Sequence, residues 1–203
     1  MAEIQGVCDP RFEAVHQLLY DNLDSGADTG ASVAVMLGGE LVVDLWGGSV
    51  AANDATPWQH DTIVNVWSTT KTMMALSALL LVDRGLLDVD APVSTYWPEF
   101  AQNGKEHVRV RQFLGHTSGI SGWEKPITLD EVLDWELSTE KLAAQAPWWE
   151  PGTQSGYHAM NQGHLVGEVV RRISGMKLGE FFRKEIAEPF DIDFHIGLSE
   201  DEF

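Results

Sequence analysis

The sequence predicts a mixed α+β (α/β) fold, in which an antiparallel β-hairpin near the N-terminus precedes a long, mainly helical region. Residues 31–37 and 41–46 are rich in Val and Leu, as strands are. Between them lies Gly38-Gly39, and both glycines accept the positive φ of a tight hairpin turn. After residue 66, apolar residues recur at helical spacing.

The hairpin raises a question about stability. A two-stranded hairpin is marginally stable by itself, and its edges are left unpaired. We therefore expect either that helices cover the hairpin completely or that polypeptide outside this chain supplies further strands. No internal repeat or low-complexity tract accompanies it.

The first helix is predicted from its start signal. Asp9 is a good N-cap, and Pro10 suits the first helical position. Apolar residues then recur at helical spacing, namely Phe12, Val15, Leu19 and Leu23. Residues 50–62 show neither a helical nor a strand period, so we expect them to be irregular.

The remaining helices are delimited by caps and stop signals. A long helix is expected from Ser68 to about Asp83, because Gly85 ends it. Thr128 and Glu131 have the spacing of a capping box. The later helices are predicted at residues 110–114, 128–137, 161–173 and 178–187.

Composition and charge exclude several classes of function. The 203 residues contain 13 Lys+Arg and 31 Asp+Glu, for a net charge of −18, and no basic cluster interrupts this acidity. This argues against nucleic acid as a partner. The single cysteine, Cys8, permits neither an internal disulfide nor a Cys-based metal site, and no pair of histidines has metal-ligand spacing. We expect no metal and no cofactor.

The N-terminal ten residues have neither the positive nor the apolar region of a signal peptide. The longest apolar stretch, residues 75–82, is much shorter than a membrane span. We therefore expect a soluble, cytoplasmic protein that does not bind a membrane.

Ser68 and Lys71 are the candidate catalytic pair. Residues three apart share a helix face, so the hydroxyl and the amine can meet at hydrogen-bond distance. A serine hydroxyl is a weak nucleophile until a base takes its proton. The helix N-terminus also offers free backbone N–H groups, and that of Ser68 is a candidate oxyanion donor. The spacing alone favours an ordinary N-cap serine with a solvated lysine.

The residues around the pair favour the catalytic interpretation. Apolar residues flank it on both sides and predict a largely buried helix. A lysine in the first turn of such a helix requires a reason. The flanking residues are Ile63, Val64, Val66 and Trp67 before the pair, and Met73, Met74, Leu76, Leu79 and Leu80 after it.

A family resemblance rests on several motifs in one order. Trp67-Ser-Thr-Thr-Lys71-Thr-Met resembles the nucleophile motif of serine β-lactamases, penicillin-binding proteins and family VIII carboxylesterases. The chain also resembles these proteins in the segment after the nucleophile helix, in a His-Thr-Ser-Gly loop, in a Pro-Gly-Thr and Tyr block, and in the helix that follows. These segments are residues 85–100, 110–120, 150–157 and 167–175.

The family's second motif is only partly present. Tyr157 matches its tyrosine, but Ala159 stands where class C members have an asparagine, and Asn161 is out of register. The resemblance implies that Tyr157 shares with Lys71 the removal of the Ser68 proton and then returns it to the leaving alkoxide. A loop tyrosine that anchors its hydroxyl on the backbone is the alternative. Loss of the amide favours a simple ester over a β-lactam as substrate.

The resemblance implies a β-lactamase/transpeptidase-like fold. Residues 1–203 would form the N-terminal part of one domain, divided into a helix plus hairpin (1–66), the nucleophile helix (67–84) and a mainly helical region (85–203). Family members usually run to nearly twice this length, and their C-terminal strands carry a third motif and the second oxyanion N–H. We therefore expect a fragment, a cleaved chain, or one part of an assembly whose second chain carries those strands. A naturally short homologue is the alternative.

Candidate substrate-binding residues come from the loops that flank the cleft in this family. They are Trp123, Trp148 and Trp149, with core packing as an equal alternative, and His158, which follows Tyr157. His116, in the His-Thr-Ser-Gly loop, is expected to be a structural hydrogen-bonding residue rather than a base.

Three functions remain open from the sequence. The first is a carboxylesterase that hydrolyses small, short-chain esters through an acyl-enzyme on Ser68. The second is a β-lactamase or D-Ala-directed peptidase. The third is a non-catalytic binding homologue or an inactive fragment. Acyl transfer to an alcohol other than water is also compatible with the same residues.

Overall fold

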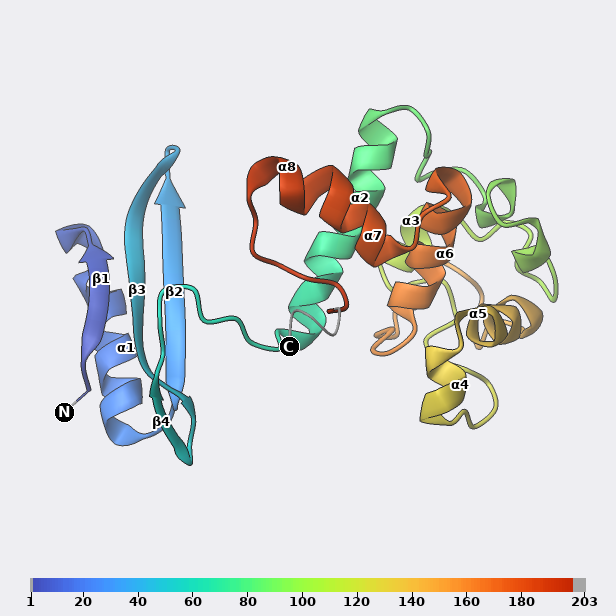
Figure 1. The fold of residues 1–203 in the computed structure, drawn as a ribbon. Helices are drawn as coiled ribbons and strands as arrows, with labels where there is room; N and C mark the ends of the chain where they lie inside the picture. Colours follow the sequence, from blue (N-terminus) through green and yellow to red (C-terminus); the bar gives the residue numbers. More distant parts are fainter. Residues whose placement is uncertain (1, 199–203) are drawn as a thin grey trace. The chain divides into compact units, whose positions relative to one another are not determined.

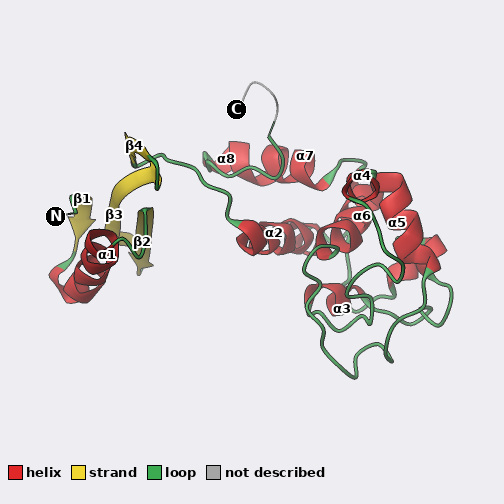
Figure 2. Cartoon of the chain, turned by 90° about the horizontal axis from the view of Figure 1, so that it is seen from below, coloured by secondary structure: helices red, strands yellow, loops and turns green. Residues whose placement is uncertain are grey.

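The computed structural model describes residues 2–198 and divides between Val64 and Asn65 into two compact units. We call residues 2–64 the strand unit and residues 65–198 the helical unit (Figure 1). All the described strands lie in the strand unit, and all the described α-helices except α1 lie in the helical unit, as Figure 2 shows.

The strand unit holds an antiparallel sheet of four strands. In the sheet, β1 and β2 lie on either side of β3, and β4 pairs with the end of β3. The elements are β1 (Ile4–Cys8), α1 (Glu13–Ser25), β2 (Gly30–Leu37), β3 (Glu40–Ala51) and β4 (Asp54–Pro57). The predicted hairpin is therefore confirmed as β2 and β3, joined at Gly38 and Gly39 with φ of 61° and 86°.

The structure has two strands that the sequence analysis did not predict. β4 falls within residues 50–62, which we expected to be irregular. Its sequence is Asp-Ala-Thr-Pro, in which only Thr favours a strand. β1 is five residues long and contains Gly6, whose φ is +110° and whose added Cβ would lie 1.9 Å from the carbonyl oxygen of Asp44. The chain itself thus supplies two of the strands that a lone hairpin lacks.

Helix α1 packs against β3. Leu19 joins Val42, Val43 and Leu45 in a small apolar core. The start signal is also as predicted, since the carboxylate of Asp9 accepts from the N–H of Arg11 and caps a 3₁₀ turn that precedes α1.

The helical unit is built around two central helices, α2 and α6, which pack against each other. Its α-helices are α2 (Thr70–Asp83), α3 (Val110–Leu114), α4 (Leu129–Leu133), α5 (Trp135–Ala144), α6 (Gln162–Ser174), α7 (Leu178–Phe182) and α8 (Glu188–Phe190), with a π-helical turn over Arg183–Ala187. Ser68 lies in a 3₁₀ turn, Trp67–Thr69, that leads into α2.

Most predicted helices are confirmed, with one interruption. The capping box of Thr128 and Glu131 forms, but the helix ends at Leu133 rather than continuing to residue 137. Asp134 takes an extended conformation and caps a new helix, α5, by accepting from the N–H of Leu137. A second N-cap inside an apparently continuous helical pattern is the physical reason for the break.

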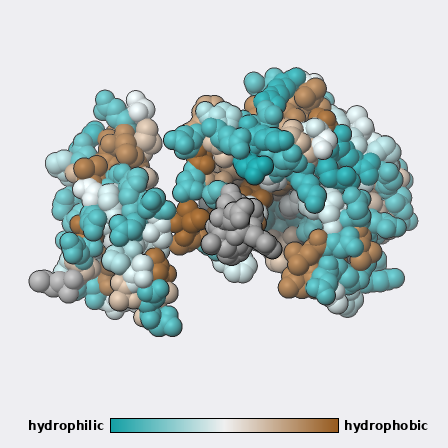
Figure 3. All heavy atoms as spheres, in the orientation of Figure 1, coloured by the Kyte–Doolittle hydropathy of each residue, from teal (hydrophilic) through white to brown (hydrophobic). Residues whose placement is uncertain are grey.

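Helix α2 is less buried than the sequence suggested. Its buried residues are Met74, Ser77, Ala78 and Leu81. Leu76 and Leu79, on another face, are 43% and 52% exposed. Figure 3 shows apolar patches, in brown, among a largely polar surface. This second apolar face is only about half covered within the helical unit, so the helix is fully buried along one face rather than all round.

No helix among residues 2–198 has the length and apolar character needed to cross a bilayer. Within the same residues, no group of three or more His, Cys, Asp or Glu side chains is placed to hold a metal ion.

Candidate active site

Three side chains that the sequence singled out meet at one atom, the Ser68 hydroxyl oxygen. The Lys71 amine donates to it at 3.2 Å, and the Tyr157 hydroxyl donates to it at 2.5 Å. The Lys71 nitrogen also lies 5.0 Å from the centre of the Tyr157 ring. Ser68 comes from the 3₁₀ turn that leads into α2 and Lys71 from the first turn of α2, whereas Tyr157 comes from a loop 89 residues after Ser68.

The backbone before Ser68 is strained. Trp67 has φ of 47°, in the left-handed region that a bulky side chain rarely adopts. Its N–H donates to the side-chain oxygen of Asn65 at 3.0 Å, which helps to hold this conformation. Backbone strain of this kind clusters at functional sites. Nothing in the sequence pattern predicted it, because a positive φ at a tryptophan has no residue signature.

Lys71 has a second acceptor that fixes its position. Its amine donates to the carbonyl oxygen of Ala159 at 2.9 Å. Residue 159 therefore contributes its backbone to the site, although it lacks the amide side chain of the family's second motif. Asn161 is fully buried, and its side-chain nitrogen donates to the carbonyl of Ile120 in the core.

The pKa of the Tyr157 hydroxyl is lowered from its usual value. The main cause is its hydrogen bond with Ser68, and the nearby Lys71 amine contributes in the same direction. When Tyr157 is ionised, the Ser68 hydroxyl donates this hydrogen bond instead, and together with the Lys71 charge it favours the phenolate, which is the form able to accept a proton from Ser68.

His158 lies in a different environment from the one that the sequence suggested. Its side chain is fully buried and hydrogen-bonds to Ser118 at 2.6 Å and to the carbonyl of Gly156 at 2.6 Å. A buried imidazole with both nitrogens occupied cannot touch a substrate from this position. This corrects the expectation that His158 contacts substrate.

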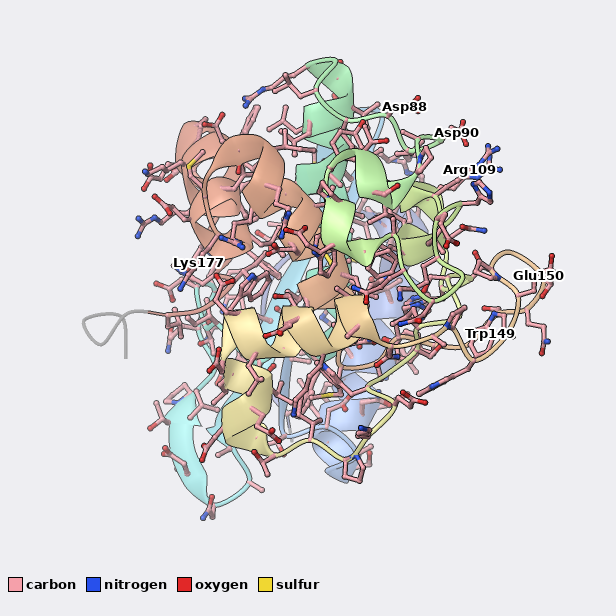
Figure 4. All side chains as sticks on the ribbon, turned by 90° about the vertical axis from the view of Figure 1, so that its right-hand side faces the viewer. Asp88, Asp90, Arg109, Trp149, Glu150 and Lys177 are labelled. Atoms are coloured by element: carbon pink, nitrogen blue, oxygen red, sulfur yellow. The ribbon has the colours of Figure 1, made fainter. Side chains whose placement is uncertain are left out.

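The three tryptophans proposed for substrate binding differ in exposure. Trp148 is 51% exposed. Trp149 is half-buried, and its indole N–H donates to the carbonyl of Gln154. Figure 4 shows Trp149 and Glu150 together on the loop that follows α5. Trp123 packs at the edge of the main core and donates to the carbonyl of Ser138 at 3.2 Å.

Within the helical unit, the site is open to solvent. Ser68 is exposed, Tyr157 is 54% exposed, and Lys71 is half-buried. Within the helical unit, the hydrogen-bonded trio therefore forms one wall of the site, and the Ser68 hydroxyl lies at its exposed side.

Comparison with known proteins matches the chain to one family over most of its length. The sequence profile of the family described as Beta-lactamase matches residues 16–203. The esterase/β-lactamase LipL of Mycobacterium tuberculosis is 38% identical over 95% of this chain, and esterase EstB of Burkholderia gladioli is 29% identical over 79% of it.

Solved structures give the same result for the fold. The crystal structure of a family VIII carboxylesterase superposes with a TM-score of 0.92 and 44% identity over 98% of this chain. A penicillin-binding protein homologue from Caulobacter crescentus superposes with a TM-score of 0.94 and 42% identity, also over 98%. The chain covers 44% of LipL, 45% of EstB and 55% and 54% of these two structures, so it spans about half the length of the relatives it matches.

Proposed function

The chain belongs to the β-lactamase family, and from this premise we propose that it carries the nucleophilic part of a serine carboxylesterase. The proposed substrates are small, short-chain esters, and the proposed intermediate is an acyl-enzyme on Ser68. The single observation that carries the proposal is the convergence of Lys71 and Tyr157 on the Ser68 oxygen, at 3.2 and 2.5 Å.

The geometry supports a two-step mechanism. The Tyr157 phenolate takes the proton of the Ser68 hydroxyl while the Lys71 amine stabilises the phenolate, and the serine oxygen bonds to the ester carbonyl carbon. Tyr157 then returns the proton to the leaving alkoxide as the carbon–oxygen bond of the ester breaks. In the second step a water molecule gives its proton to Tyr157 and attacks the acyl carbon, and Ser68 recovers its proton as it leaves.

Ala159 supports an ester rather than a β-lactam as the substrate. The amide that holds a β-lactam or peptide side chain in class C relatives is absent at this position, and its nearest counterpart, Asn161, is committed to the core. Trp148, which is 51% exposed on the loop after α5, is a candidate to contact an acyl or alcohol group. Trp149 is a second candidate, because its ring lies against Gly156, next to Tyr157. Trp123 packs against the main core.

We further propose that another polypeptide segment, carrying the C-terminal strands of the fold, completes the site. The exposure of Ser68 and Tyr157 supports this, because a water-excluded site strengthens the electrostatic stabilisation of an oxyanion. That segment would supply the second oxyanion donor, whose loss lowers kcat by about 10²- to 10³-fold in other hydrolases.

Ester hydrolysis tests the proposed function. We expect the 203-residue chain to hydrolyse p-nitrophenyl butyrate slowly, faster than nitrocefin, and to lose this activity in Ser68→Ala but not in Ser25→Ala, a substitution of an exposed serine in the strand unit. Nitrocefin turnover above that of the ester would support the β-lactamase alternative. Brisk ester turnover by the chain alone, abolished in Ser68→Ala, would contradict the need for a further segment.

A further inference from the structure

His116 holds the loop that carries Tyr157 from both sides. Its backbone carbonyl accepts the N–H of Gly156 at 3.0 Å, and its ring nitrogen Nδ1 accepts the N–H of His158 at 3.1 Å. These are the residues immediately before and after Tyr157. The His116 ring also lies against the Tyr157 ring, with centres 4.8 Å apart.

The hydrogen bonds fix the protonation of His116. A backbone N–H can only donate, so Nδ1 of His116 must be unprotonated, and the neutral ring carries its proton on Nε2. The residue has φ of 59°, a conformation that Asn, Asp and His tolerate better than most side chains. Both the ring and the backbone of His116 are therefore turned toward the loop.

A second histidine supports the same loop from inside the protein. Nδ1 of His158 faces the carbonyl of Gly156, so this nitrogen carries the proton, and Nε2 accepts from the Ser118 hydroxyl. The Ser118 oxygen in turn accepts from the N–H of Ile120, and Ser121 donates to the same Gly156 carbonyl. Every link in this network suits a neutral, buried imidazole.

We propose that His116 is a positioning residue for Tyr157, and that its neutral imidazole is what keeps the phenol on Ser68. Protonation of His116 places a hydrogen on Nδ1, against the N–H of His158, and removes the acceptor that holds this side of the loop. The inference rests on the proposed function for its consequence in catalysis, but the hydrogen bonds can be tested independently of any activity.

The charged and titratable groups around His116 determine the direction of the pH dependence. Lys71 from α2, Tyr157 and His158 from the adjacent loop face the ring. Burial lowers the pKa of His116 below its usual value, and the positive charge of Lys71 lowers it further. The ring is thus neutral at pH 7. The hydrogen bond from the N–H of His158 is lost as the pH falls through this lowered pKa, so the reactivity of Ser68 should decrease at acidic pH, which we call the acid limb.

Three variants separate the role of the nitrogen from that of the fold. His116→Asn keeps an acceptor close to Nδ1 and tolerates the positive φ, but it does not titrate. His116→Ala removes the acceptor. His107→Asn replaces an exposed histidine in the same unit and is the control.

The test uses ¹⁵N NMR of the histidine rings together with the rate at which a fluorophosphonate labels Ser68, both on the 203-residue chain. We expect an unprotonated Nδ1 at His116 at pH 7. We expect labelling to fall by about 10²-fold in His116→Ala, because a misplaced catalytic group costs this much. In His116→Asn we expect a rate close to wild type at pH 7, without the acid limb attributed to His116.

Two results would overturn the proposal: a proton on Nδ1 of His116 at pH 7, or a pH profile in His116→Asn identical to that of wild type and His107→Asn. If Ser68 is not labelled in any variant, the proposed function fails instead. The positioning role is then decided by the ring spectrum and by ultraviolet titration of the Tyr157 phenol, whose lowered pKa should return toward the ordinary tyrosine value in His116→Ala.

Discussion

Ser68 and Lys71 lie on one continuous helical segment, a 3₁₀ turn that runs directly into α2, whereas Tyr157 lies on a loop that a second loop holds in place. On the helix side, the distance between the two groups follows from the i, i+3 geometry of the backbone. On the loop side, the position of the phenol depends on hydrogen bonds to His116, His158 and Ser118, which come from distant parts of the sequence. The helix side and the loop side of the trio should therefore respond differently to mutation.

The largest expected effect tests whether both sides are needed. Lys71→Met and Tyr157→Phe each remove one hydrogen-bond partner of the Ser68 oxygen, so each should slow ester hydrolysis by about 10²- to 10⁴-fold, the usual contribution of a positioned acid–base group. Steady-state hydrolysis of p-nitrophenyl butyrate measures this. Near-normal activity in Tyr157→Phe would mean that the helix side suffices and that the loop side has no catalytic role.

The next effect concerns the hydrogen bond between Ser118 and His158, which supports the loop that carries Tyr157. Ser118→Ala leaves Nε2 of the buried His158 without a donor and should lower the free energy of unfolding by about 1–3 kcal/mol. The matched control is Ser138→Ala, a fully buried serine whose hydroxyl has no partner among the described residues, so its loss should be neutral or stabilising. Urea denaturation compares the two. Equal destabilisation would show that the Ser118 bond contributes nothing specific.

The pH dependence of Ser68 reactivity separates the loop side from the helix side. Because the pKa of Tyr157 is lowered by its hydrogen bond with Ser68 and by Lys71, the phenolate should form at a lower pH than in free tyrosine. Labelling of Ser68 should therefore rise through that lowered pKa, and this rise should be absent in Tyr157→Phe. An unchanged rise in the Phe variant would show that Tyr157 is not its source.

The smallest expected effect concerns the strain next to the helix. Trp67→Asn replaces a bulky residue at φ of 47° with one that tolerates this conformation, and the Trp67 side chain is 76% exposed, so little packing is lost. Relief of this strain should raise the free energy of unfolding by up to about 1 kcal/mol. Trp148→Asn, an exposed tryptophan without a positive φ, should give no gain. Thermal unfolding of the two variants provides the comparison.

The contrast between the helix side and the loop side also explains which parts of the fold and the site could be predicted from the sequence. The β2–β3 hairpin and the α2 and α6 helices follow from periodicity, turn residues and caps, and the Ser68–Lys71 distance follows from α2. Strands β1 and β4 were missed because one is short and contains Gly6, and the other consists largely of residues that disfavour strands.

The loop side of the site was predictable only through resemblance. Tyr157 was identified by a motif, but no periodic pattern connects it with residue 116. The burial of His158 and the positive φ of Trp67 and His116 arise from tertiary contacts, for which a single sequence contains no local signal. The exposed face of α2, with Leu76 and Leu79, is a further example, because the hydrophobicity of a helix face predicts that the face is covered but not which segment covers it.

The central claim is that Ser68 is the nucleophile activated by Lys71 and Tyr157. The most direct test is peptide mapping by mass spectrometry after the chain is mixed with p-nitrophenyl butyrate and quenched with acid. The account predicts a butyryl group on the peptide that contains Ser68, absent in Ser68→Ala and strongly reduced in Tyr157→Phe. A butyryl group on another residue, or equal labelling of the wild-type and Tyr157→Phe chains, would contradict it.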